Sequence, residues 1–217
     1  QEVIDQMVQS HGTMHLNGLK DAYFDAIRHS LITVQPFCSE GSLFDFDENI
    51  RTGKPLSLGV FLDYMQQISL GLEQMQQAPL NFVCFGDIQE SNIFVNYEGG
   101  RYVLKLGDWG QARSLNDSSG KKFVRSLGYP PNMAPECVGR KVAPTSKSDI
   151  FSLGHMGLTW LTGKRLSGWN GMEMGEWKAL SLRQRKRVCD YPIAERYSQM
   201  TQTFVDDFVT SALEEAR

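Results

Sequence analysis

The 217-residue sequence lacks several features that would place it in a familiar class at once. Its four cysteines, Cys38, Cys84, Cys137 and Cys189, form no C-x-x-C pair, which argues against a zinc site and leaves buried thiols as the expectation. No apolar run approaches the length of a membrane span, and no charged segment followed by an apolar core marks a signal peptide. The net charge is −3, so no positive field would attract nucleic acid.

What the sequence does contain is enough apolar residues for a folded core. Hydrophobic residues make up 41% of the chain and charged residues 22%. Phe61, Met65, Ile68, Leu72 and Met75 recur at intervals of four and three, which predicts one buried stripe of a helix. Residues 149–162 are apolar nearly all round and predict a buried helix. We also predict strands at 22–27, 30–35, 82–85, 92–96 and 101–106, a hairpin turn at 97–100, a loop over 111–133, and further helices over 2–10 and 203–215.

Three motifs stand in one order along the chain. The segment Gly86-Asp87-Ile88-Gln89-Glu90-Ser91-Asn92 follows one predicted strand, Asp108-Trp109-Gly110 follows another, and Ala134-Pro135-Glu136 ends the long loop. Together they resemble the protein-kinase set H-R-D-L-x-x-x-N, D-F-G and A-P-E. Two flanking segments fit the same resemblance, since 42–46 looks like the helix after the kinase hinge and 148–154 looks like the central helix of the large lobe.

The resemblance covers roughly residues 30–215 and implies a fold. We expect an α+β, protein-kinase-like fold with a mainly helical C-lobe and a reduced N-lobe. Residues 1–37 would be the N-lobe remnant, consisting of a segment like kinase helix C and two strands. Residues 38–217 would be the C-lobe.

The resemblance also implies a site for ATP and Mg²⁺. Asp87 matches the catalytic aspartate that accepts a proton from the substrate hydroxyl. Asn92 and Asp108 match the metal ligands, and hard oxygen ligands of this kind suit Mg²⁺. Gln35 falls at the gatekeeper position, and Pro36 and Cys38 would offer backbone groups of the hinge to the adenine.

Further residues would have structural roles by the same resemblance. Asp149 would accept backbone N–H bonds from the catalytic loop. Trp109 and Phe85 would stand in the hydrophobic stack that usually contains a Phe and a His. Glu136 would pair with an arginine near the end of the lobe, for which Arg217 is the candidate.

The sequence departs from the kinase pattern at several points. No G-x-G-x-x-G and no V-A-I-K lysine is visible, and Glu2 is the candidate for the helix glutamate that would pair with such a lysine. Gly86 replaces the loop arginine, which implies that a phosphorylated activation loop is not read there. Gln89 replaces the loop lysine that steadies the transferring phosphate, a loss that weakens electrostatic stabilisation. Tyr129 and Asn132 replace the Thr and Tyr of G-T-x-x-Y-x-A-P-E.

Two functions therefore stay open, and we favour the first. One is an atypical protein Ser/Thr kinase that transfers the ATP γ-phosphate with Mg²⁺ to a protein substrate. The other is a pseudokinase that acts as a non-catalytic scaffold for a protein partner. A small-molecule kinase is a third alternative, against which the A-P-E segment argues.

The missing glycine loop and the G-D pair are also similar to the rhoptry-kinase family of apicomplexan parasites, in its subgroup without a glycine loop. That resemblance implies secretion into a host–parasite compartment. Without it, a cytoplasmic location is the default expectation.

Overall fold

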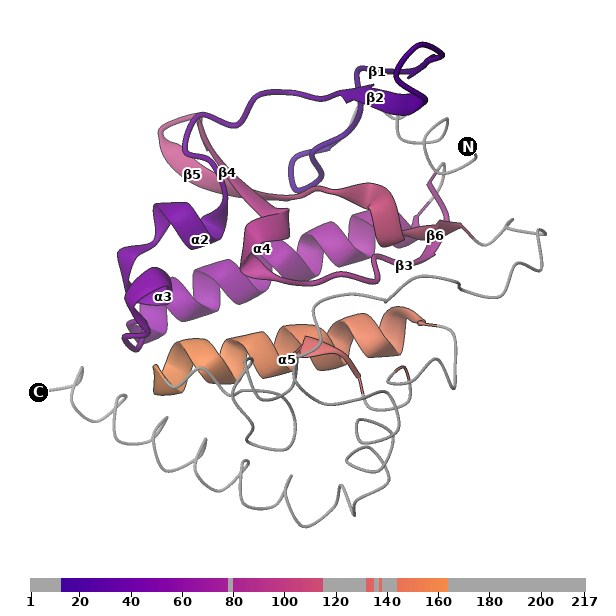
Figure 1. Ribbon diagram of the computed structural model, residues 1–217. Helices are drawn as coiled ribbons and strands as arrows, with labels where there is room; N and C mark the ends of the chain where they lie inside the picture. Colours follow the sequence, from indigo (N-terminus) through magenta and orange to yellow (C-terminus); the bar gives the residue numbers. More distant parts are fainter. Residues whose placement is uncertain (1–12, 78–79, 115–131, 135–136, 138–143, 164–217) are drawn as a thin grey trace, which may run out of the picture.

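Two long helices, α4 and α5, pack against each other in the computed structural model (Figure 1). The structure describes residues 13–77, 80–114, 132–134, 137 and 144–163. The helices are α2 (Leu43–Phe46), α3 (Glu48–Thr52), α4 (Leu58–Gln76) and α5 (Ser146–Thr162), and the 3-10 helices are η1 (Glu90–Asn92) and η2 (Trp109–Gln111). The strands are β1 (Asp21–Asp25), β2 (Ser30–Val34), β3 (Phe82–Cys84), β4 (Ile93–Glu98), β5 (Arg101–Leu106) and β6 (Arg113–Ser114).

Helix α4 follows the predicted apolar stripe. Phe61, Ile68, Leu72 and Met75 are buried in the main core, and Met65 packs against it. Ser57 is the N-cap of the helix, because its hydroxyl accepts a hydrogen bond from the Val60 N–H at 3.5 Å. The stripe is thus confirmed as the face that α4 buries.

Helix α5 begins earlier and is less buried than the sequence indicates. It begins at Ser146, because Thr145 and Ser148 form a capping box in which each side chain bonds the backbone of the other. Leu153, Met156 and Trp160 are buried, and the Trp160 ring meets Tyr64 of α4 edge-on at 5.9 Å. Ile150, however, is 55% exposed, so the prediction of burial all round is wrong on that side.

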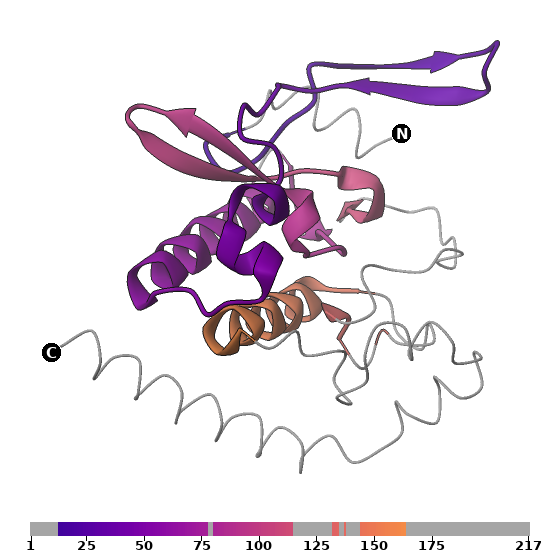
Figure 2. The same cartoon turned by 60° about the vertical axis from the view of Figure 1, so that its left-hand side comes forward.

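Three antiparallel strand pairs surround the helices. The β4–β5 hairpin lies against α4 and pairs Ile93 with Leu106 through to Glu98 with Arg101, as predicted. The β1–β2 hairpin stands away from the rest of the described structure (Figure 2). Strand β6 pairs with β3. Because β6 lies within residues 111–133, the prediction of a loop there is wrong at its start.

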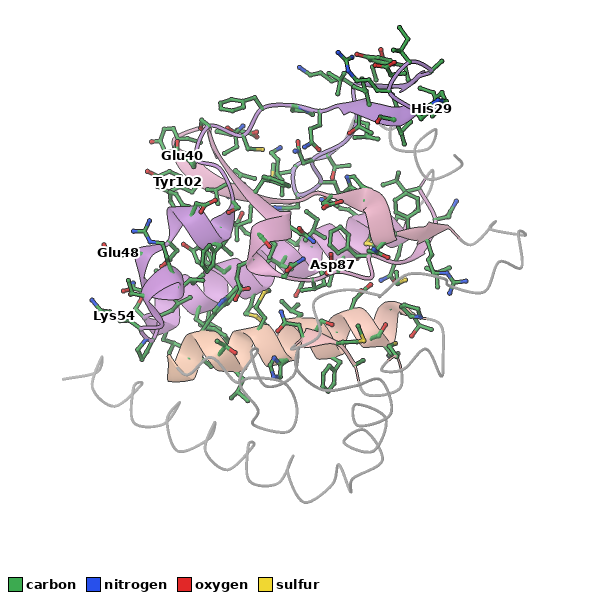
Figure 3. All side chains as sticks on the ribbon, in the orientation of Figure 1. His29, Glu40, Glu48, Lys54, Asp87 and Tyr102 are labelled. Carbon is green, nitrogen blue, oxygen red and sulfur yellow. The ribbon has the colours of Figure 1, made fainter. Side chains whose placement is uncertain are left out.

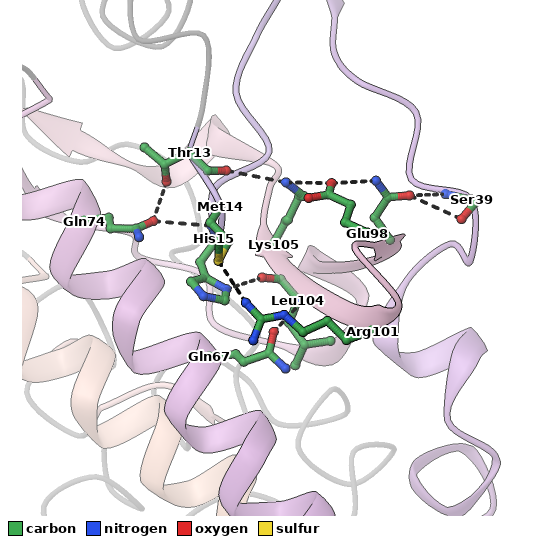
Figure 4. Close-up of polar contacts among 11 residues, drawn as sticks. Thr13, Met14, His15, Ser39, Gln67, Gln74, Glu98, Arg101, Leu104 and Lys105 are labelled. Atoms are coloured by element: carbon green, nitrogen blue, oxygen red, sulfur yellow. Dashed lines mark hydrogen bonds and ion pairs between the residues drawn. The ribbon is translucent and has the colours of Figure 1, made fainter.

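The segment before β1 is fastened to α4 and β5 (Figure 4). Gln74 of α4 accepts hydrogen bonds from the Thr13 hydroxyl and, at 3.3 Å, from the His15 N–H. Nδ1 of His15 bonds the Leu104 carbonyl at 3.0 Å. Leu16 is buried in the same core as α4. The division at residue 37 into an N-lobe remnant and a C-lobe stays a prediction.

Two further expectations concern thiols and membranes. Cys38, Cys84 and Cys137 are buried and lie outside any disulfide within the described residues, which confirms that expectation for these three. No helix in the described part of the chain is long and apolar enough to cross a membrane.

Candidate functional site

Helix α5 holds the start of residues 85–92, the predicted catalytic loop, through one carboxylate. Both oxygens of Asp149 accept backbone hydrogen bonds, Oδ2 from the Phe85 N–H at 2.7 Å and Oδ1 from the Gly86 N–H at 2.9 Å. The role predicted for Asp149 is thereby confirmed in geometry. Burial raises its pKa to about 6 although the two N–H donors act in the opposite direction. The loop is therefore anchored by a carboxylate whose charge is costly to bury.

Gly86 explains why no arginine stands before Asp87. Its φ is +83°, a conformation that side chains rarely adopt, and a Cβ there would lie 2.8 Å from the Gln111 carbonyl oxygen. The backbone of η2 therefore runs directly against the catalytic loop. This contact brings the segment that contains Asp108 next to the one that contains Asp87.

Asp87 and Asn92 belong to one hydrogen-bonded loop. The Asn92 side chain donates through Nδ2 to the Asp87 carbonyl at 3.0 Å, and the Gly107 N–H donates to the Asn92 carbonyl at 2.9 Å. The Gln89 side chain donates through Nε2 to Oδ2 of Asp87 at 3.1 Å. Glu90, in turn, accepts from the Trp160 indole at 3.1 Å. Figure 3 shows Asp87 above α5 and far from His29 at the tip of β1–β2.

Asp108 has a strained backbone. Its φ of 60° places a non-glycine residue in the left-handed region, and its Oδ1 accepts from the Gly110 N–H at 3.3 Å. Such conformations cost on the order of 1–3 kcal/mol and gather at functional sites. The next residue, Trp109, is buried edge-on against Phe85 at 5.3 Å and donates to the Asn17 carbonyl at 2.9 Å. The predicted aromatic stack is therefore present, with Trp109 anchoring the turn that orients Asp108.

The segment just after the predicted hinge, residues 35–38, is hydrogen-bonded to β4. The Glu40 N–H donates to the Val95 carbonyl at 3.2 Å, and the Val95 N–H donates to the Gly41 carbonyl at 2.9 Å. Within the hinge, Gln35 is exposed, Pro36 is half-buried and Cys38 is buried. The Cys38 carbonyl accepts from the Gly41 N–H at 3.2 Å, which leaves one of its two lone pairs for a ligand.

Comparison with known proteins identifies this framework. A family model described as the protein kinase domain matches residues 4–215. The chain belongs to the protein kinase family. The serine/threonine-protein kinase Nek5 of Mus musculus is 36% identical over 125 residues, which cover 57% of this chain and 18% of that protein. A probable serine/threonine-protein kinase of Dictyostelium discoideum is 33% identical over 153 residues, covering 70% of this chain and 29% of that protein.

The kinase domain also has a counterpart among solved structures. A chain in the crystal structure of the yeast RNA Pol II CTD kinase CTDK-1 complex matches it with a TM-score of 0.60 at 14% identity, covering 86% of this chain and 54% of that chain. This likeness shows the fold alone. Together with the family match it confirms the predicted α+β, kinase-like fold. The chain spans less than a third of the length of the two curated relatives.

The oxygen atoms that the kinase site offers fit a hard cation that also binds phosphate oxygens. Because Asn92 turns its amide nitrogen to the Asp87 carbonyl, its amide oxygen is the atom left for a metal. Asp108 is exposed and offers a carboxylate from its left-handed turn. No cluster of three or more His, Cys, Asp or Glu side chains within the described residues forms a metal site by itself. Two protein oxygens completed by phosphates and water suit Mg²⁺.

A pocket opens below the catalytic loop, on the side of α5. Asp87 and Asp149 line it together with Asn132, Ala134 and Ser152. Asn92 and Asp108 do not line this pocket, so of the three residues predicted to be catalytic or metal-binding only Asp87 does. The metal, catalytic and hinge roles assigned to these residues stay predictions.

Sequence reasoning missed the contacts of Gly107 and of Asn132, besides the hydrogen bond from Gln89 to Asp87. A Cβ at Gly107 would lie 2.6 Å from the Phe94 ring, so the ring covers the residue just before Asp108. Asn132, singled out only as a departure from the motif, is buried and hydrogen-bonds both Ile88 and His155. The glycine before Asp108 was a signal for the first contact, whereas nothing local in the sequence connects residues 88, 132 and 155. Glu2, Tyr129, Glu136 and Arg217 lie outside the described residues.

Proposed function

We propose that the chain is the catalytic part of an atypical protein Ser/Thr kinase, which transfers the γ-phosphate of ATP to a Ser or Thr hydroxyl with the help of Mg²⁺. The observation that carries the proposal is the hydrogen-bonded unit of Asp87, Gln89 and Asn92, joined to the strained turn at Asp108. Its relatives named above are serine/threonine kinases, which supports the same class of acceptor.

The reaction follows from the positions of these groups. The substrate hydroxyl oxygen forms a bond to the γ-phosphorus, the bond from that phosphorus to the β–γ bridging oxygen breaks, and ADP leaves with the electron pair. Asp87 aligns the hydroxyl and accepts its proton. Asn92 and Asp108 would hold Mg²⁺, which supplies positive charge to the phosphate oxygens. The Cys38 N–H and the Pro36 carbonyl are the hinge groups that we assign to the adenine.

Gln89 is the observation that favours a second candidate function. Its amide orients the Asp87 carboxylate at 3.1 Å but adds no positive charge where a lysine usually stands. A loop that is well ordered yet lacks a cation also suits a pseudokinase scaffold that binds a protein partner. We favour the enzyme because two oxygen ligands and the catalytic carboxylate are retained together.

A radiolabel transfer assay on the full-length protein tests the proposal. We expect Asp108→Ala to abolish transfer and Asp87→Ala to lower it by about 10²–10⁴-fold, since proton acceptance and hydroxyl alignment both fail. We expect Gln89→Lys to keep or raise the rate, because a cation returns beside the transferring phosphate. The matched control is Asp63→Ala, which removes an exposed carboxylate of α4 that accepts a hydrogen bond from the Gln67 side chain at 2.9 Å.

Two outcomes would contradict the enzyme. Transfer that survives Asp108→Ala would assign the activity to another protein or another mechanism. An inactive wild type whose binding to a protein partner is unchanged by Asp87→Ala and Asp108→Ala would favour the pseudokinase.

The relatives do not support the narrower rhoptry-kinase placement, since those reported are kinases of Mus musculus and Dictyostelium discoideum. We propose that the chain binds another protein in either function, as a substrate of the kinase or as a partner of the pseudokinase. The cellular compartment stays an expectation that depends on that placement.

A further inference from the structure

A buried polar bridge connects α5 to the carbonyl that follows Asp87. Asn132 and His155 are each 5% exposed. The Asn132 side chain donates through Nδ2 to the Ile88 carbonyl at 3.1 Å, and its Oδ1 lies 3.1 Å from Nδ1 of His155. The three groups come from the catalytic loop, from the segment before Ala134 and from the middle of α5. The bridge thus joins three parts of the chain that are distant in sequence.

The direction of each hydrogen bond in the bridge is fixed. Because the amide nitrogen of Asn132 donates to Ile88, its oxygen faces His155 and accepts. Burial lowers the pKa of His155 to about 4, so the ring is neutral at neutral pH and its one proton is on Nδ1. The Phe151 ring stacks on His155 at 6.4 Å with an angle of 17° between the planes, which fixes the ring orientation.

Burying the bridge lowers the free energy of unfolding. Nε2 of His155 is buried and has no hydrogen-bond partner among the described residues. A buried acceptor left without a partner costs stability, whereas apolar side chains of similar shape would avoid that cost. What the bridge holds in place is the Ile88 carbonyl, through the side-chain amide of Asn132.

We propose that Asn132 and His155 form a positioning pair that orients the peptide unit between Ile88 and Gln89, and with it Asp87 and Gln89. Asp149 holds the loop at Phe85 and Gly86 by accepting, and Asn132 holds it at Ile88 by donating, so α5 fixes both sides of Asp87. The Gln89 side chain that bonds Asp87 starts from this same peptide unit. Neither residue of the pair contacts the reacting atoms in this scheme.

This inference rests on the proposed kinase activity, and its test separates the two. Asn132→Leu, His155→Phe and the double variant are compared in the full-length protein. We expect each single variant to lower kcat by about 10- to 100-fold, as small displacements of catalytic groups do, with little change in KM for ATP. The double variant should lose no more than the worse single variant, because either change breaks the same bridge. It should also keep a thermal midpoint close to that of the wild type, since the buried polar groups are removed together.

Ser152→Ala is the matched control. Ser152 lines the same pocket from the same helix, but its hydroxyl donates to the Ser148 carbonyl of α5 at 2.9 Å and does not reach the loop. We expect its kcat to match that of the wild type. A double variant with the kcat of the wild type, or single losses that simply add, would overturn the positioning pair.

Amide hydrogen exchange gives a readout that needs no activity. The Asn92 N–H donates to the Gln89 carbonyl at 3.0 Å, so a loosened Ile88–Gln89 unit should speed exchange at Asn92. The Phe85 and Gly86 amides, held by Asp149, should not change and serve as the internal reference. If the wild type transfers no phosphate, the kinase proposal fails, and exchange alone decides the pair. Unchanged exchange at Asn92 in all three variants would then overturn it.

Discussion

At the scale of single residues, Asp149 has two opposing effects on the loop that it holds. Its oxygens satisfy two buried N–H groups, which would otherwise cost about 1–3 kcal/mol each. Its own burial penalises the charge that makes it a good acceptor, which is why its pKa rises to about 6. The ionisation of Asp149 should therefore contribute to the pH dependence of stability.

The predicted consequence is a difference in stability between the wild type and Asp149→Asn that depends on pH. The folded pKa of Asp149, about 6, lies above the ordinary value of 3.8, so the folded protein binds more protons than the unfolded chain between these pH values. The wild-type free energy of unfolding should therefore fall, relative to that of the variant, as pH rises from about 4 to about 6. Urea unfolding of both proteins across this range measures the difference. A difference that grows in the opposite direction would show that the carboxylate is stabilised, not penalised, when it ionises.

Gly86 gives a second prediction at this scale. Gly86→Ala forces a Cβ to within 2.8 Å of the Gln111 carbonyl oxygen at a φ of +83°. We expect a loss of about 1–3 kcal/mol in the free energy of unfolding, together with a displaced η2. Gly59→Ala is the control, because a Cβ at Gly59 of α4 has nothing within 4 Å and should stabilise the helix by roughly 0.5–1 kcal/mol. Equal effects of the two substitutions in denaturant titration would contradict the close approach.

The sequence could predict the role of a residue where a kinase motif also specified which residue it contacts. The pairing of Asp149 with the loop and of Trp109 with Phe85 follows from motif positions, and the structure confirms both. The contacts of Gln89 and Asn132 did not follow. A hydrogen bond between side chains depends on rotamers and on distant backbone, and neither leaves a periodic signal along the chain.

At the scale of elements, the α4–α5 contact supports the loop from below. Gly157 of α5 faces α4, and a Cβ there would lie 3.1 Å from the Met65 sulfur and 3.2 Å from the Phe61 ring. The missing side chain lets the two helices approach closely. The position of Asp149 under the catalytic loop therefore depends on a small residue two turns further along α5.

We predict that Gly157→Leu separates these helices and that Gly154→Leu does not. The larger side chain at residue 157 overpacks the contact and should cost about 1–3 kcal/mol. At residue 154 a Cβ has no atom of the described residues within 4 Å, so the same change should be neutral or stabilising through helix propensity. Thermal unfolding of the two variants gives the comparison. A loss of stability at residue 154 as large as that at residue 157 would refute the close helix contact.

The elements themselves were predicted where periodicity was strong. The stripe of α4 and the β4–β5 hairpin match the structure. Helix α5 begins at Ser146, three residues before the predicted start at residue 149, because its capping box is polar and precedes the apolar run. Strand β6 was missed, since two residues that pair with β3 show no alternation of their own.

At the scale of the whole molecule, the proposed site would offer negative charge and oxygen ligands to the metal ion of a bound nucleotide. We predict that ATP binding depends on Mg²⁺, with a Kd on the order of 0.1–1 mM, or about 4–5.5 kcal/mol. Thermal-shift titration of the full-length protein with ATP, in Mg²⁺ and in EDTA, measures this. Tight binding in EDTA would contradict the assigned ligands, and Asp63→Ala should bind as the wild type does.

The overall fold could be predicted because several motifs agreed in order and spacing, and no single one was needed. The kinase fold is confirmed on that basis. Activity could not be predicted with the same security, because it depends on a few charges near the phosphate, and Gln89 changes one of them without changing the fold.

The hydrogen bonds that Asp149 accepts also set an order in which the fold is completed during synthesis. Asp149 is made 64 residues after Phe85, whose N–H it accepts. At about 5–20 residues per second, a ribosome needs several seconds to cover that distance. For that time the nascent strand β3 and the loop after it exist without the carboxylate that holds them. We therefore expect chains that stop before α5 to retain the β4–β5 hairpin sequence but no ordered catalytic loop, which would make such truncated products clients of chaperones rather than dormant enzymes.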